Sequence, residues 1–415
     1  MEFLPYIVLL ILIAVLPLFI IRYQKEKEEW NKRLQNLAKA HNLTFIKGSL
    51  GKGPEISGSI GGFSICVLRR DFSHGKSSTA TIGFLVDLDG LREKFQITAE
   101  NFISRIKKTD RKADIELDDR SFDDAALVKG GGTHTVRALL HPEARRIITQ
   151  LIESSYDRKF SLSENALETY QRTGRFMGEA EISSEIRSII RLAQLLTRKK
   201  TTEALLRENY HDEQFTSSKY VYLESLSAVV GGMTEKDEII QDALHSGNHK
   251  LAFLAVKVIG KAGFRYIPEI FSKTDDDLAI QILDYAEKNR ATSLVLFFKT
   301  TFPNIKSWPI KSAVVRFLAS TQDPSIENFL HEQLTTQEEP PIEHTVECIK
   351  ALGRCGTYGS IQVLHSLRGA LPRREIDGAI ASIQARIGTG DAGWLSIHES
   401  KDGEGNLSLE ENDEE

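Results

Sequence analysis

Two stretches decide the fold of the C-terminal half of this chain: AVKVIGKAGFRYIPEIF (residues 255–271) and CIKALGRCGTYGSIQVLHSL (residues 348–367). Each contains an apolar segment that ends near a glycine, then a short turn and a second apolar segment. Apolar residues spaced three and four apart lie on one face of an α-helix, so each stretch predicts two helices joined by a tight turn.

Similar phrases recur on both sides of these stretches. When the first helices are aligned on their last small residue, the aligned positions are Gly231, Gly260, Ala286, Ala319 and Gly353, at intervals of 29, 26, 33 and 34 residues. A period near 30 residues is typical of a solenoid, in which each helix pair buries its apolar face against its neighbours. The sequence therefore predicts an all-α solenoid over residues 216–388, closed by a capping helix after Pro372.

The two stretches resemble HEAT repeats, in which an Ala- and Leu-rich first helix ends at glycine and a second helix carries Ile and Leu. This resemblance covers roughly residues 219–368. The whole layout, with the phrases FD…LVKG…VRALLHPEARR and GWLSI…GNLSL, is similar to an uncharacterised class of bacterial membrane-anchored proteins. The resemblance implies a HEAT-like solenoid and membrane attachment. It supplies no site residue, because that class has no assigned activity.

The region before the repeats changes its period. Short β-rich runs separated by glycine begin at Leu43, and Gly61-Gly62 between two apolar residues is a two-residue hairpin signal. Pro142 opens the helical phrase PEARRIITQLIES. We predict a small α+β domain over residues 43–174 and a linker helix over residues 175–215. Residues 22–42 are predicted to form a juxtamembrane helix that stops at Asn42.

Residues 3–21 form an uncharged, apolar run. A helix of nineteen residues, at about 1.5 Å per residue, just crosses a hydrocarbon core of roughly 30 Å. Basic residues follow the run and none precedes it, which predicts an uncleaved, single-pass anchor with the N-terminus out and the body in the cytoplasm. The expected location is the cell inner membrane, with the lipid bilayer as the partner of residues 3–21.

The composition narrows the function classes. The formal net charge of −5 arises in the tail, since residues 399–415 carry a net −7 and the other 398 residues are near +2. No domain is strongly basic, so we predict no nucleic-acid partner. Residues 389–415 are acidic and rich in Gly and Ser, which predicts a disordered tail. The three cysteines show no metal-ligand or redox spacing and fit a reducing compartment.

The stretch VKGGGTHTVRALLHPEARR (residues 128–146) is the strongest candidate for chemistry. Its glycines precede a helix, but Lys129 stands before them, whereas a phosphate loop needs Lys and Ser or Thr after them. A loop with a helix cap is the favoured interpretation, with Thr133 or Thr135 as the cap. His134 and His141 have no companion ligands at a helical offset.

An acidic group in the same region has two interpretations. It comprises Asp118, Asp119, Asp123 and Asp124, which are interpreted as a solvated turn, with Mg²⁺ binding as the alternative. No nucleophile elbow or dinucleotide fingerprint is present in the sequence. We therefore predict no catalytic residue, no cofactor and no metal.

Trp308 is the one residue that the sequence marks as a partner contact, because the phrase NIKSWPIK places it in a loop between repeats. The predicted function is a membrane-anchored cytoplasmic scaffold that binds an unidentified protein through the solenoid, without catalysis. One alternative is a ligand-responsive regulator or enzyme that uses the α+β domain near residues 130–146. The other is a homo-oligomeric assembly factor.

Overall fold

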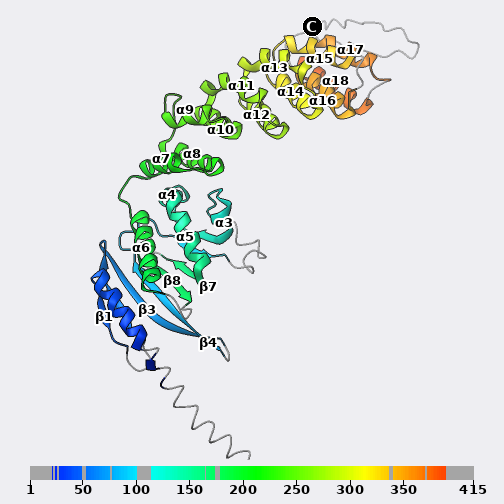
Figure 1. Ribbon diagram of the computed structural model, residues 1–415. Coiled ribbons are helices and arrows are strands. Elements are labelled where there is room, and N and C mark those ends of the chain that lie inside the picture. Colours follow the sequence, from blue (N-terminus) through cyan, green and yellow to red (C-terminus); the bar gives the residue numbers. More distant parts are fainter. Residues whose placement is uncertain are drawn as a thin grey trace, which may run out of the picture. The chain divides into compact units, whose positions relative to one another are not determined.

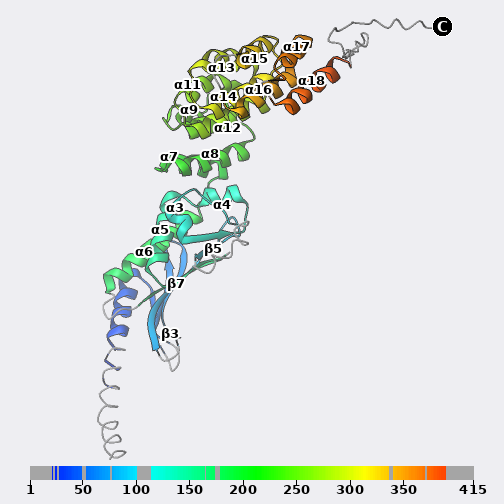
Figure 2. The same ribbon diagram turned by 90° about the vertical axis from the view of Figure 1, so that its right-hand side faces the viewer.

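The computed structural model describes most of the chain and divides it into two compact units, Met1–Ile239 and Ile240–Glu415 (Figures 1 and 2). The described residues are 21, 24–25, 28–48, 53–74, 77–100, 114–163, 165–172, 178–335, 340–369 and 372–388. The first unit holds a β-sheet with helices, and every described element of the second unit is helical.

The sheet of the first unit has eight strands in the order β1-β2-β3-β4-β8-β7-β5-β6. Each strand is antiparallel to its neighbours. Gly61 and Gly62, with φ of 60° and 89°, form the predicted turn between β2 and β3, since only glycine adopts such angles at low cost. The strands are β1 (Thr44–Ile46), β2 (Glu55–Ile60), β3 (Phe63–His74), β4 (Ser77–Asp87), β5 (Gln96–Ala99), β6 (Ala126–Lys129), β7 (Ser155–Leu162) and β8 (Ala166–Arg172).

One face of this sheet is apolar and buried. Ile56, Val67 and Phe84 are in register on adjacent strands and are all fully buried. The next residues in register, Ser57 and Cys66, point to the other face and are partly exposed, as alternation along a strand requires. Helices α5 (Pro142–Ser154) and α6 (Glu179–Leu196) pack against the strands and cover the apolar face.

The described part of the N-terminal helix, residues 28–41, packs within the first unit. Leu34 and Leu37 are buried, and the His41 ring lies 2.9 Å from the Ser183 hydroxyl of α6. Its end at Asn42, where φ is 56°, agrees with the predicted stop. The helix therefore buries its apolar stripe against protein.

The predicted fold class needs a correction at its first element. Among the described residues, no helix is long and apolar enough to cross a membrane. The predicted fold class is therefore wrong in this element: the fold that the described residues show is an eight-stranded sheet with helices followed by a helical stack, without the single transmembrane helix predicted over residues 3–21. Residues 3–20 lie outside the described residues, as does the predicted tail over residues 389–415.

Two helices join the sheet unit to the start of the predicted repeats. They are α7 (Thr202–Asp212) and α8 (Thr216–Val230), and both pack on α4 (Thr133–Leu139). The buried Tyr222 hydroxyl donates a hydrogen bond to the Leu140 carbonyl at 3.0 Å. The structure thus places α8 in the first unit, although the sequence-based boundary assigned residues from 216 onwards to the solenoid. The segment predicted as one linker helix forms both α6 and α7.

The second unit is a stack of helices. Its α-helices are α9 (Glu238–His245), α10 (His249–Ile259), α11 (Ile267–Ser272), α12 (Asp276–Lys288), α13 (Val295–Thr301), α14 (Trp308–Ser320), α15 (Ser325–Thr335), α16 (Ile342–Cys355), α17 (Tyr358–Ser366) and α18 (Arg373–Ile387). Helix α12 packs on α14, α14 on α16 and α16 on α18, while α15 packs on α17. Both views show α13, α15 and α17 on one side and α12, α14, α16 and α18 on the other (Figures 1 and 2). We call α13, α15 and α17 the odd-numbered row and α12, α14, α16 and α18 the even-numbered row.

One of the aligned small residues, Gly353, allows two helices of the even-numbered row to pack closely. A Cβ atom on Gly353 would lie 3.1 Å from the Ala379 Cα, so glycine lets α16 and α18 approach closely. The predicted helical character of this region is confirmed, and one continuous apolar core runs from α10 to α18.

Candidate functional site

The glycine loop before α4 is occupied by the chain itself. Gly130 and Gly131 have φ of 83° and 74°, and the Gly132 N–H donates to the Glu93 carboxylate at 3.0 Å. Gly132, and not Thr133 or Thr135, is the N-cap of α4. A carboxylate of the protein therefore accepts the Gly132 N–H, and the loop leads into α4 with glycine at the cap position instead of the predicted threonine.

The acidic residues around Asp119 also serve the local fold. Asp119 caps α3 (Arg120–Ala125) by accepting the Phe122 N–H at 3.2 Å. The Asp123 carboxylate accepts N–H groups of Leu117 and Asp119. Burial raises the pKa of Asp123 to about 6, although these hydrogen bonds oppose the shift. Neither carboxylate is thus arranged for a metal ion.

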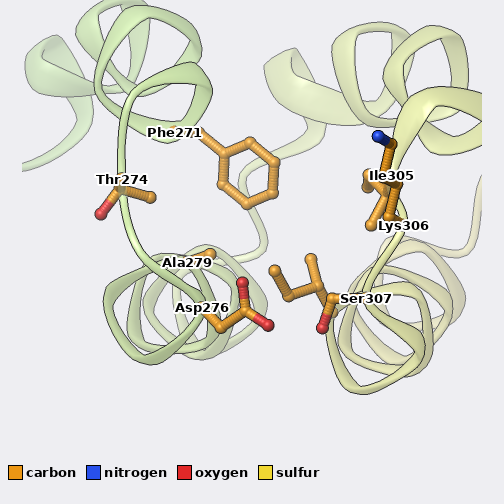
Figure 3. Close-up of a pocket in the computed structure, with 8 residues that line it drawn as sticks. Phe271, Thr274, Asp276, Ala279, Ile305, Lys306 and Ser307 are labelled. Carbon is orange, nitrogen blue, oxygen red and sulfur yellow. The ribbon is translucent and has the colours of Figure 1, made fainter.

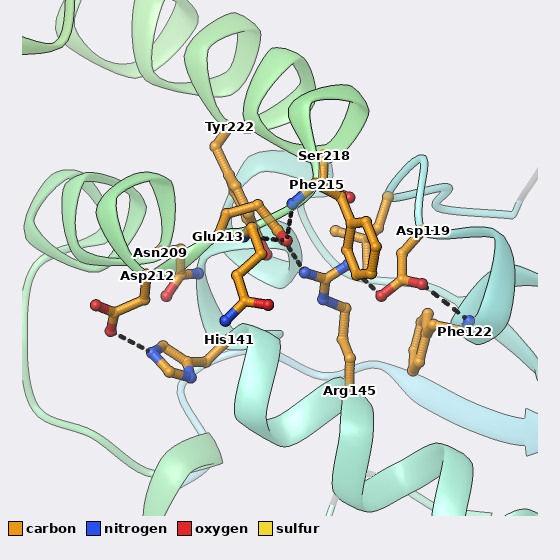
Figure 4. A network of polar contacts seen from close by, with 12 residues as sticks. Asp119, Phe122, His141, Arg145, Asn209, Asp212, Glu213, Phe215, Ser218 and Tyr222 are labelled. Atoms are coloured by element: carbon orange, nitrogen blue, oxygen red, sulfur yellow. Dashed lines mark hydrogen bonds and ion pairs between the residues drawn. The ribbon is translucent and has the colours of Figure 1, made fainter. Parts of the chain in front are cut away.

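The centre of the first unit is a buried charge network that joins three separate segments (Figure 4). Arg145 of α5 has only 1% of its surface exposed. It forms ion pairs with Asp119, at 2.6 Å, and with Glu213, between α7 and α8. The same guanidinium lies 5.9 Å from the centre of the Tyr222 ring of α8. Arg145 therefore ties α3 and the α7–α8 segment to the helix that covers the sheet.

The His141 side chain lies beside this network in a group that resembles a metal site. Ligand atoms of His141, Glu208 and Asp212 all lie within 4.8 Å of one another. However, His141 Nδ1 accepts the Glu143 N–H at 3.1 Å, so the neutral ring has its proton on Nε2, which donates to Asp212 at 2.9 Å.

Metal binding would have to break these contacts. A metal on Nε2 would require a proton on Nδ1, which would then face the Glu143 N–H. Glu208 is already bound by Arg198 at 2.8 Å and Lys200 at 2.7 Å. The atoms that could ligate a metal are therefore already engaged: those of Glu208 by two cationic side chains, and those of His141 and Asp212 by hydrogen bonds. The group is a structural polar cluster, and His134, the other histidine marked in the sequence, is not part of it.

A cavity of about 700 Å³ opens next to the Arg145 network. One wall is the face of α5 that carries Arg145, Thr149 and Glu153, one helical turn apart. The opposite wall comes from the segment between α7 and α8, where 61% of the Phe215 surface is exposed. No sequence pattern marks this site, because its walls are far apart in the chain.

The second unit contains a cysteine next to a histidine, a pair that can act as nucleophile and base. Cys348 Sγ lies 3.6 Å from His344 Nε2, and both side chains are buried. Burial raises the pKa of the Cys348 thiol to about 12 and lowers the pKa of His344 to about 4. A catalytic pair needs the opposite shifts, which favour thiolate and imidazolium. The pair is therefore core packing.

We expect the Cys348 thiol to resist alkylation in the folded protein. A maleimide at pH 8 should modify it more than about 100-fold more slowly than a cysteine introduced by Ser382→Cys on the exposed face of α18, because burial blocks access and disfavours the thiolate. Peptide mass spectrometry over time gives both rates, and urea should abolish the difference. Equal rates in the folded protein would contradict the structural assignment.

Trp308, the predicted partner contact, is the first residue of α14 and is half-buried. Its ring lies 5.0 Å from the ring of His344, and the Lys311 ammonium lies 4.4 Å from the ring centre. Part of the indole therefore packs within its own unit. A contact of its exposed part with a partner stays a prediction.

A groove of about 490 Å³ lies between the ends of neighbouring helix pairs (Figure 3). Three of its lining residues, Ile305, Lys306 and Ser307, directly precede Trp308 in the sequence. Phe271 and Ile305 face each other across the groove, and Asp276 and Lys306 place opposite charges on its two sides. Its size and mixed lining suit an apolar side chain flanked by polar groups.

The two rows of the second unit differ in charge. In the odd-numbered row, Glu332 is the only charged residue among the exposed ones, and the structure describes these three helices completely. The other exposed residues there are Leu296, Thr300, Ser325, Asn328, Thr335, Tyr358, Gly359, Gln362, His365 and Ser366. The even-numbered row is charged, and Arg316 of α14 forms ion pairs with Asp284 at 2.7 Å and Glu287 at 3.0 Å.

No family model, curated protein or solved structure matches this chain. The function is therefore argued from the geometry of its own residues.

Proposed function

We propose that this protein is a scaffold that binds another protein through the odd-numbered row of its second unit, without catalysing a reaction. The observation that carries the proposal is the low charge of that row. Charged residues are depleted at the centres of protein interfaces, where aromatic and aliphatic side chains are enriched. On this row, Leu296 is 73% exposed and Tyr358 is 43% exposed. Burying their apolar surface against a partner would be favourable, because apolar surface in contact with water is unfavourable.

The architecture supports the same function. We propose that the pairs α10–α11, α12–α13, α14–α15 and α16–α17 are HEAT-like repeats. Stacked repeats present one long surface made of equivalent helices, which suits recognition of an extended partner. The even-numbered row carries charged side chains, including the ion pairs of Arg316, so the two rows differ in surface chemistry. The cytoplasmic location and the unidentified protein partner expected from the sequence stay predictions.

Photo-crosslinking in cells tests the proposal. A photoreactive amino acid at Leu296 or Gln362 should give the same protein adduct, whereas the matched exposed positions Gln281 and Ala381 of the even-numbered row should give none. Adding Leu296→Asp should lower the adduct yield from Gln362 more than about fivefold, because a desolvated carboxylate in an interface costs several kcal/mol.

Two outcomes would count against the scaffold. Equal adducts from both rows would show that the odd-numbered row has no special role. An adduct that contains only a second copy of this chain would show that the row binds another copy of the protein instead of a different protein. That result would favour the homo-oligomeric assembly factor, the alternative predicted from the sequence.

A further inference from the structure

The cavity beside Arg145 has polar groups that the folded chain leaves without partners. Thr149 has an exposed fraction of 8% and lines the cavity, and no hydrogen bond joins its hydroxyl to another described residue. Arg145 Nε, one turn earlier on α5, is also buried without a partner in that part of the chain. Buried donors are usually paired, so a ligand that brings an oxygen acceptor would satisfy this wall.

The charge of the cavity is negative. Five carboxylates and two guanidinium groups line it. Arg145 is bound by Asp119 and Glu213, and Glu143 is bound by Arg191 at 2.7 Å from outside the cavity. Within the described residues, Asp212 is bonded by the His141 ring alone, at 2.9 Å, and Glu153 makes no ion pair. Arg146 is the one remaining cation, so carboxylate is in excess.

An aromatic ring completes the lining. Phe215 belongs to the lining and is drawn among the residues of the network in Figure 4, and most of its surface is exposed. Carboxylates together with an aromatic face recognise guanidinium and alkylammonium groups, through ion pairs and cation–π contact. Anions are disfavoured by the same charge.

We propose that this cavity binds an arginine or lysine residue of a polypeptide. The backbone carbonyl accepts from the Thr149 hydroxyl, and the cationic end reaches Glu153 or Asp212 with the stem against Phe215. Thr149 and Glu153 are one helical turn apart on α5, about 6 Å, which a single basic residue spans. The site lies in the first unit and is independent of the odd-numbered row.

Saturation-transfer NMR on the full-length protein tests this assignment with small probes. N-acetyl-arginine methylamide should bind with a dissociation constant on the order of 1 mM, as its size allows. Its citrulline analogue has nearly the same shape without the charge and should bind at least about tenfold more weakly. Spermidine, which has charge but no carbonyl, should also bind more weakly, because Thr149 then gains no acceptor.

Variants locate the site. The exposed changes Glu153→Gln and Phe215→Ala should each weaken the arginine probe at least about fivefold, and the buried change Thr149→Val should do so as well. Asp89→Asn, an exposed carboxylate of the same unit outside the cavity, should leave binding unchanged. Equal binding of the arginine and citrulline probes, tight binding of spermidine, no binding of the arginine probe, or variants that behave like the unchanged protein would overturn the proposal.

Discussion

Replacing Arg145 by methionine is expected to lower the free energy of unfolding of the first unit by about 3–5 kcal/mol. The guanidinium is buried between Asp119 and Glu213, of which Glu213 is also buried. Methionine fills a similar volume but leaves the two carboxylates next to each other without a cation. The loss therefore comes from uncompensated charge in a site with little water, and lost packing adds little.

A triple variant separates charge from packing. Asp119→Asn and Glu213→Gln remove both negative charges. Their amide oxygens can still accept hydrogen bonds from the Phe122 and Phe215 N–H groups, which the carboxylates accept in the unchanged protein. Combined with Arg145→Met, these two substitutions should restore at least half of the lost stability, because no buried ion is left alone. Arg146→Met, one residue further on the exposed side of α5, is the matched control and should change stability by less than about 0.5 kcal/mol.

Urea denaturation followed by circular dichroism gives the stabilities, and hydrogen exchange in α5 assigns the transition to the first unit. Equal effects of Arg145→Met and Arg146→Met would show that the network contributes no more than a surface charge. A triple variant as unstable as the single one would show that packing, and not charge, controls the site.

The features that the sequence predicted correctly are local ones. The glycine turn at Gly61, the helix stop at Asn42 and the start of α5 at Pro142 each depend on residues within a few positions. The Arg145 network could not be predicted in this way, because its carboxylates lie 26 and 68 residues from the arginine. Long-range ion pairs leave no periodic signal in one sequence.

Two other predictions show where pattern and structure part. The helical period correctly predicted paired helices in the second unit, but it did not say which row faces a partner. A signal was present, since the exposed positions of α13 and α17 carry no Asp, Glu, Lys or Arg, while those of α12 are mainly Asp and Lys. The apolar run at the start predicted a spanning helix from composition alone, and no helix among the described residues has that character.

Lowering the pH from 7 to 4.5 is expected to destabilise the second unit, chiefly through His344. Burial, with a smaller effect of the Lys311 charge, lowers the pKa of His344 to about 4. Its Nδ1 lies 3.0 Å from the Ser312 hydroxyl and its Nε2 lies beside the Cys348 thiol, so within the described residues no carboxylate bonds to the ring and stabilises a proton on it. The folded state therefore keeps this ring neutral where an unfolded chain would protonate it.

The direction follows from proton binding in the two states. Below the ordinary histidine pKa of about 6.5 the unfolded chain binds a proton that the folded unit does not bind until about pH 4, so stability is complete above pH 6.5 and falls as the pH drops through this window. The full window corresponds to about 3 kcal/mol, and most of it is crossed by pH 4.5. Carboxylates whose pKa is lowered, such as Glu327, lose their contribution only below about pH 4.5.

His344→Gln should remove this pH dependence, because glutamine keeps a hydrogen-bonding side chain but cannot titrate. His365→Gln changes an exposed histidine of α17 that lies away from His344 in sequence, and it is the matched control that should leave the dependence intact. Hydrogen exchange of α16, corrected for the intrinsic pH dependence of exchange, measures the stability of this unit at each pH. An unchanged slope in His344→Gln, or a flattened slope in His365→Gln, would assign the acid sensitivity to another group.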